Sequence, residues 1–169
     1  ARNFAALQTH RPAMFMLLSS VKASTRYQFA MGKSGRLVIV DHRVAIKPFV
    51  LTPGGDPLGY IQAVMQELAD KMQRGDPLGL VGIGCGTLVG TLAMMSPKLF
   101  LGQQQAIFVF EPDVELVLAC LMLHDFSGLN GPIQQMRFQW FIGEDWAAQF
   151  ERTIHDDLML PRPVTRVCQ

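Results

Sequence analysis

A glycine cluster in the middle of the chain has the residue types and spacing of a ligand-binding loop. The apolar run 78–81 enters the cluster 82–86 (GIGCG), and Thr87 then opens a predicted helix. Glycines at a strand-to-helix turn let the backbone approach a ligand closely, and the free N–H groups of a helix start attract an anion or a polar ligand edge. The spacing predicts a binding loop, with a tight turn that holds no ligand as the alternative.

A second apolar run, 106–110, ends on Glu111 and is predicted to be the next strand of the same sheet. An acid at the tip of that strand suits the two hydroxyls of a ribose. Glu111 also stands just before Pro112 and Asp113, where the helix dipole favours carboxylates, so a role at the helix start is the alternative. The glycine cluster and Glu111 together predict a crevice for a nucleoside-containing ligand.

A third group of glycine and acidic residues follows the predicted strand 137–142. Gly143, Glu144 and Asp145 stand at its carboxyl end, where open α/β sheets bind ligands. Capping of the next helix is the alternative role of Asp145. We assign no catalytic residue and no metal ligand. The predicted cofactor-binding residues are Gly82, Gly84, Cys85, Gly86, Glu111, Gly143, Glu144 and Asp145.

The glycine spacing departs from the dinucleotide fingerprint G-x-G-x-x-G. Counted from Gly82, the third glycine position holds Thr87, and counted from Gly84 it holds Val89. Because the fingerprint glycines serve a bound pyrophosphate, this spacing disfavours NAD.

The same segment resembles the first motif of S-adenosylmethionine-dependent methyltransferases. Its glycines have that motif's spacing, and residues 110–112 (FEP) resemble the acid after the second strand of those enzymes. The chain departs from the pattern at Leu80, where these enzymes usually carry an acid. S-adenosylmethionine and a nucleotide are therefore the two cofactor candidates.

Three further groups have residue types suited to chemistry. His124 and Asp125 would form a general base if the carboxylate oriented the imidazole, but adjacent residues seldom face each other, and a helix end is the favoured interpretation. Residues 155–157 (HDD) have metal-ligand types, yet they end a polar helix and are more typical of a solvated surface. A helix start would stabilise the thiolate of Cys85, although a small buried residue also suits that turn.

Composition narrows the functional classes. The net charge is +1 and the charges are scattered, which disfavours nucleic acid as a partner. Three cysteines without CxxC spacing indicate a reducing compartment, so we expect a cytoplasmic protein. The apolar run 13–18 is too short for a membrane span and does not resemble a full signal peptide. The chain begins at Ala1 and ends in a short tail after residues 161–163 (PRP), which suggests a piece of a longer protein.

The first part of the chain is predicted to form a small α+β cap over residues 1–52. It comprises short helices at 3–9 and 13–20 and strands at 25–30 and 36–41, joined by a glycine-bearing hairpin loop. A further β-like stretch, 45–51, contains Pro48 and therefore fits only a sheet edge.

The second part, residues 53–169, is predicted to be a Rossmann-like domain. Asp56 caps a long amphipathic helix, with Pro57 in its first turn. Apolar strands that alternate with helices imply right-handed crossovers and a parallel sheet with helices on both faces, so the fold class is α/β. The predicted strands are 78–83, 106–110 and 137–142, and the helices are 87–96, 113–123 and 145–157.

Short motifs along nearly the whole chain resemble the amino-terminal domain of bacterial motility accessory factors and related glycosyltransferase-like proteins, which are themselves related to pterin pyrophosphokinase-like proteins. The chain departs from these proteins at Gly59 and Tyr60, where they often place an acid. The motifs are 3–7 (NFAAL) with Pro12, 56–57 (DP), 81–86 (VGIGCG), 110–113 (FEPD), 121–127 (LMLHDFS) and 141–145 (FIGED).

The resemblance implies a Rossmann-like domain that precedes a separate transferase domain and takes part in protein or envelope glycosylation. In such a protein this domain would bind a nucleotide or serve as a scaffold. The expected partners are a nucleoside-containing small molecule and the following transferase domain, and neither nucleic acid nor a membrane is expected. The alternatives are an S-adenosylmethionine-dependent methyltransferase and a structural interaction module.

Overall fold

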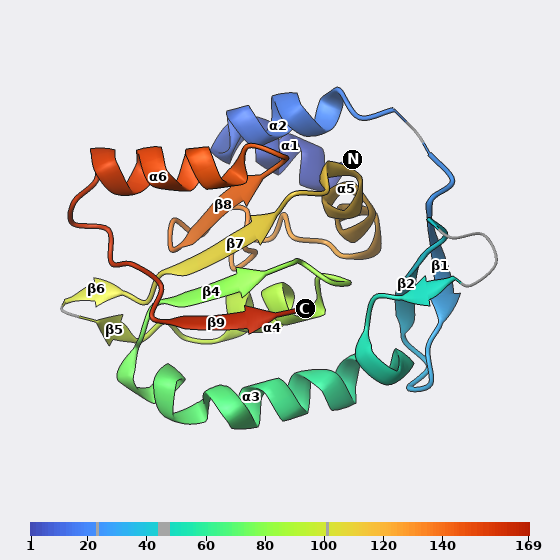
Figure 1. Cartoon of the computed structure of the whole chain (residues 1–169), viewed down its shortest axis with the longest axis horizontal. Helices are drawn as coiled ribbons and strands as arrows, with labels where there is room; N and C mark the ends of the chain where they lie inside the picture. Colours follow the sequence, from blue (N-terminus) through green and yellow to red (C-terminus); the bar gives the residue numbers. More distant parts are fainter. Residues whose placement is uncertain (23, 44–47, 101) are drawn as a thin grey trace.

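A computed structural model describes residues 1–169 with the exception of residues 23, 44–47 and 101. The described chain is a mixed α/β structure with six α-helices, a four-stranded parallel sheet, a three-stranded antiparallel sheet and a two-stranded hairpin. Figure 1 shows the three-stranded sheet at one end of the molecule, beyond the carboxyl ends of the parallel strands.

The parallel sheet has the strand order β8-β7-β4-β9. Every neighbouring pair in it is parallel. In chain order these are the third, second, first and fourth strands of the sheet, so the direction of strand progression reverses beside β4. The strands are β4 (Leu78–Val81), β7 (Ile107–Glu111), β8 (Phe138–Ile142) and β9 (Thr165–Cys168).

Helices cover both faces of this sheet because its central strands are apolar on both sides. Ile107 and Val109 of β7 belong to a large core that includes residues of α4 (Thr87–Met94) and α5 (Val114–Leu123). Phe108 and Phe110 belong to a smaller aromatic core on the other face, under α6 (Trp146–Asp156). Side chains of successive strand residues point to opposite faces, which explains the division.

The remaining helices extend the larger core. It includes residues of α1 (Arg2–His10), α2 (Pro12–Ser19) and α3 (Pro57–Arg74). As predicted, Asp56 is the N-cap of α3, and its carboxylate accepts a hydrogen bond from the Leu58 N–H (3.2 Å). Leu7 of α1 and Leu18 of α2 are buried in this core, so the two N-terminal helices share the core of the parallel sheet.

The three-stranded antiparallel sheet, here called the N-terminal sheet, consists of β1 (Tyr27–Met31), β2 (Leu37–Asp41) and β3 (Phe49–Val50). The hairpin of β1 and β2 was predicted from the sequence. The predicted stretch 45–51 lies partly outside the described residues, and its described part forms β3 at the edge of the sheet, next to β2. Edge placement suits the strand because Pro48 has no N–H to donate.

Two differences from the predicted fold concern short strands. Residues 165–168 were expected in a tail, but they form β9, which pairs with β4 from Leu78↔Thr165 to Val81↔Cys168. The hairpin of β5 (Leu99–Phe100) and β6 (Gln103–Gln104) was also not predicted. Within the described residues, no helix is both long enough and apolar enough to cross a membrane.

Candidate functional site

The glycine cluster 82–86, here called the glycine loop, follows β4 as predicted. Gly82, Gly84 and Gly86 have φ values of +87°, +54° and +80°, a region that side chains disfavour. A Cβ on Gly82 or Gly84 would lie 3.1 Å from an oxygen of Gln169, whereas one on Gly86 would lie 3.1 Å from the ring of His124. The three glycines therefore permit close contacts with two different neighbours.

Glu111 ties the glycine loop to the start of α5. Its side chain is buried, and one carboxylate oxygen accepts the Ile83 N–H (2.9 Å) while the other accepts the Asp113 N–H (2.8 Å). Burial raises the pKa of Glu111, and the two backbone hydrogen bonds oppose that shift. The cap of α5 is Asp113, which accepts from the N–H groups of its first turn, so Glu111 bridges two segments and does not cap the helix itself.

His124 supports the same loop from the opposite direction. Its Nε2 lies 2.7 Å from the Cys85 carbonyl oxygen, and its ring stacks on Phe126 with a centroid separation of 5.4 Å. A carbonyl only accepts, so Nε2 carries the hydrogen. Asp125 instead accepts from the N–H and hydroxyl of Ser127. The favoured interpretation of His124 and Asp125 as a helix end is confirmed, because α5 ends at Leu123.

His124 predicts a pH dependence of folding stability. Burial lowers its pKa, against the hydrogen bond to Cys85. The unfolded chain, with a histidine pKa of about 6.5, therefore takes up the proton first as the pH falls, so the folded state loses stability below that pH. We expect His124→Gln, which keeps an N–H donor, to lose less free energy of unfolding than the native chain between about pH 7.5 and about pH 5.5 in urea titrations. The exposed His155→Gln is the control, and equal losses in the native chain and His124→Gln would contradict the prediction.

Cys85 is held inside the protein between two hydroxyl groups. The Thr52 hydroxyl donates to Cys85 Sγ (2.8 Å), and the Thr87 hydroxyl lies 3.1 Å from the same sulfur. Cys85 as a whole is only 5% exposed. This arrangement fits the small buried residue considered for the turn, and it joins the glycine loop to the segment that follows β3.

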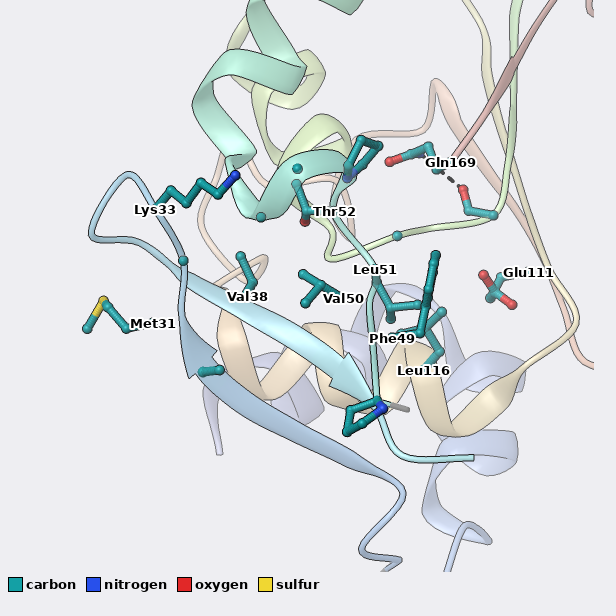
Figure 2. Close-up of a pocket in the computed structure, with 18 residues that line it drawn as sticks. Met31, Lys33, Val38, Phe49, Val50, Leu51, Thr52, Glu111, Leu116 and Gln169 are labelled. Atoms are coloured by element: carbon teal, nitrogen blue, oxygen red, sulfur yellow. Dashed lines mark hydrogen bonds between the residues drawn. The ribbon is translucent and has the colours of Figure 1, made fainter. Parts of the chain in front are cut away.

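A cavity of about 740 Å³ lies between the glycine loop and the N-terminal sheet. We call it the glycine cavity. Gly82, Gly84 and Glu111 form one wall, and Phe49, Val50 and Leu51 contribute apolar surface to the other. Figure 2 shows Lys33 and Glu111 on opposite sides of it, with Val50 between them. Gln169 reaches the glycine loop, and its side-chain amide donates to the Gly82 carbonyl (3.1 Å).

A second cavity, of about 780 Å³, lies beside the glycine cavity and is lined in part by residues 143–145, the third predicted group of glycine and acidic residues. We call it the acidic cavity. Glu111 lines both cavities. Cys85 instead contacts Thr52, and Gly86 lies against His124. Asp145 precedes α6, but its carboxylate accepts from the Gln149 side chain (2.7 Å) and not from a helix N–H. The structure thus divides the predicted cofactor residues between two adjacent spaces and the loop's interior.

An ion-pair cluster between the two sheets was not predicted from the sequence. Arg26 lies 3.2 Å from Asp41 in β2 and 2.6 Å from Asp113 at the start of α5. The Tyr27 hydroxyl also donates to Asp113 (2.8 Å). These contacts fix the N-terminal sheet against the carboxyl ends of the parallel strands and thereby form the two cavities.

Neither a similarity to known proteins nor a group of metal ligands in the described residues indicates a function. No family model, curated protein or solved structure matches the chain. In the described part of the chain, no three His, Cys, Asp or Glu residues are grouped so that they could hold a metal ion. His155 and Asp156 are exposed and contact each other at 3.5 Å. The cavities are therefore the basis on which a function is assigned.

Sequence reasoning missed the opposite wall of the glycine cavity. That wall includes Lys33 in the β1–β2 turn, Phe49 and Val50 in β3, and the turn 53–55. The glycines at 54 and 55 signal a turn, but no local pattern predicts that this turn faces the glycine loop.

Proposed function

We propose that the chain is a Rossmann-like domain that binds a nucleoside-containing small molecule in the glycine cavity. The position of the cavity carries the proposal. In open α/β sheets, ligands bind beyond the carboxyl ends of the strands at the point where the strand order reverses. Gly82 and Gly84 follow β4, Gln169 follows β9, and these two adjacent strands are on either side of the reversal.

The size and lining of the cavity support this ligand class. Small-molecule sites typically have volumes of about 300–1,000 Å³ and apolar walls with a few polar groups. The glycine cavity has about 740 Å³, with Phe49 and Val50 able to cover a base. Gln169 supplies an amide that can bond to a polar ligand edge. Among its described lining residues the titratable side chains are Lys33 and Glu111, which favours binding over catalysis.

We further propose that this domain is an accessory module of a glycosyltransferase-type protein. That part rests on the motifs that resemble motility accessory factors. Three of those motifs meet around the site: the glycine loop, the segment that contains Glu111, and the segment that contains His124. Sequencing the parent gene tests it, because a reading frame that continues past Gln169 into a second α/β domain is expected. A gene that encodes no further domain would contradict the accessory role.

Calorimetric titration tests ligand binding directly. We expect at least one of S-adenosylhomocysteine, the four common ribonucleosides and UDP-glucose to bind with a micromolar dissociation constant, equivalent to about −8 kcal/mol. Val50→Trp, which places an indole ring on the apolar wall of the cavity, should weaken that binding at least about tenfold. Val164→Trp is the matched control because Val164 is exposed and lies before β9. Absence of heat with every compound at several temperatures would overturn the proposal.

A methyltransferase is the second candidate, supported by the place of Glu111 at the tip of β7 beside Gly82 and Gly84. Both oxygens of Glu111 already accept backbone hydrogen bonds, and Leu80 is fully buried in the core where these enzymes usually carry an acid. Selective binding of S-adenosylhomocysteine, together with methyl transfer from S-adenosylmethionine to an added acceptor, would favour this candidate over the accessory module.

A further inference from the structure

We infer that the glycine cavity selects ligands without a phosphate group, so that it takes a nucleoside, or a zwitterionic nucleoside derivative, in preference to a nucleoside diphosphate. The inference rests on the proposed function and specifies the chemical class of its ligand. Three features of the structure support it: the state of the loop N–H groups, the position of the α4 start, and the charges around the cavity.

The first feature is that a buried carboxylate already accepts a hydrogen bond from an N–H group of the glycine loop. In phosphate-binding loops, backbone N–H groups between a strand and a helix point at the phosphate. Here the Ile83 N–H donates to Glu111 (2.9 Å), and the Asp113 N–H donates to the other oxygen of the same carboxylate (2.8 Å). Glu111 is only 4% exposed, so a phosphate could not take these donors without displacing a buried side chain.

The second feature is that the start of α4 opens on a different space. Thr87, the first residue of α4, lines a third cavity together with His124 and Arg36. Gly86, the N-cap of α4, lies against His124 and Phe126. Gly82 and Gly84, by contrast, line the glycine cavity. The partial positive charge of a helix start acts within its first turn, and it is therefore not directed at a ligand in the glycine cavity.

The third feature is the charge around the cavity. Lys33 is exposed and stands on the side opposite Glu111 (Figure 2). The adjoining acidic cavity shares Glu111 with the glycine cavity, and its lining has six acidic and two basic side chains. Arg26 and Arg43 are the two basic residues, and both are paired with Asp41 and Asp113. A diphosphate in the glycine cavity would lie beside this negatively charged lining of the acidic cavity, which disfavours it.

Matched nucleosides and nucleotides test the inference. Each common ribonucleoside and its 5′-diphosphate is titrated calorimetrically into the native chain in buffer without divalent cations. We expect the nucleoside that binds most tightly to bind at least about tenfold more tightly than its diphosphate. Raising the salt concentration from about 50 mM to about 500 mM should reduce this difference in affinity, because salt screens the repulsion between the diphosphate and the acidic side chains.

A charge variant gives a second measurement on the same wall. Val50→Lys adds an ammonium group to the glycine cavity. It should lower the ratio of the diphosphate's dissociation constant to the nucleoside's about tenfold, whereas the exposed control Val164→Lys should leave this ratio unchanged. Circular dichroism is used to check that both variants are folded. A diphosphate that binds as tightly as its nucleoside, a ratio that widens with salt, or an unchanged ratio in Val50→Lys would overturn the inference while ligand binding stands. Absence of binding by every compound would overturn the proposed function itself.

Discussion

Replacing Glu111 by glutamine is expected to lower the free energy of unfolding by about 2–4 kcal/mol. Glutamine has nearly the same shape, but one of its two terminal groups is an amide NH₂. Both oxygens of Glu111 accept backbone N–H groups, from Ile83 and from Asp113. The amide nitrogen would face one of these donors, so a buried N–H would lose its acceptor and a second donor would lie against it.

Urea denaturation measures this change, and Glu144→Gln is the matched control. Glu144 is exposed at the rim of the acidic cavity, so its replacement should alter the stability by less than about 0.5 kcal/mol. Hydrogen exchange adds a local readout, because the Ile83 N–H should exchange faster in Glu111→Gln by more than the global loss of stability explains. Equal stabilities of Glu111→Gln and Glu144→Gln would show that the carboxylate does not hold the glycine loop.

Much of the fold follows from local patterns in the sequence. The apolar runs 78–81 and 106–110 predict buried parallel strands because they are continuous, and the amphipathic stretch after Asp56 predicts α3 because its cap and spacing agree. β9 has neither signal. It is four residues long, it contains Arg166, and only Thr165 in it is buried. Its strand conformation depends on pairing with β4, which lies far earlier in the chain.

The candidate site divides in the same way. The position of the glycine loop is predictable because glycines after a buried strand are a local signal. The roles of Glu111 and His124 are not predictable, since each is fixed by a backbone group that the fold brings near: the Ile83 N–H and the Cys85 carbonyl. The apolar wall is less predictable still. Val50 lines the glycine cavity because Arg26 and Tyr27 fix the N-terminal sheet against α5.

Asn3 is expected to have a large effect on stability, although it lines neither the glycine cavity nor the acidic cavity. Its amide nitrogen donates to the Leu121 carbonyl (2.6 Å) and to the His124 carbonyl (2.7 Å), and its oxygen accepts the Phe126 N–H (2.8 Å). Asn3 is buried in α1, and its three partners surround the end of α5. One side chain therefore satisfies backbone groups that the helix end leaves without intrahelical partners.

Asn3→Ala is expected to lower the free energy of unfolding by about 3–5 kcal/mol, because each buried backbone group that loses its partner costs about 1–3 kcal/mol and water offsets part of the sum. Urea denaturation measures the loss, and Asn130→Ala at an exposed turn should change the stability by less than about 0.5 kcal/mol.

Asn3→Leu separates the hydrogen bonds from the volume, because leucine has a similar branched shape but neither donates nor accepts a hydrogen bond. If Asn3→Leu were as stable as the native chain, the hydrogen bonds of Asn3 would not hold α1 to the end of α5. A loss in Asn3→Leu close to that in Asn3→Ala would instead assign most of the effect to those hydrogen bonds. Because His124 follows this helix end and supports the glycine loop, Asn3 would then contribute to the site from more than a hundred residues away in the sequence.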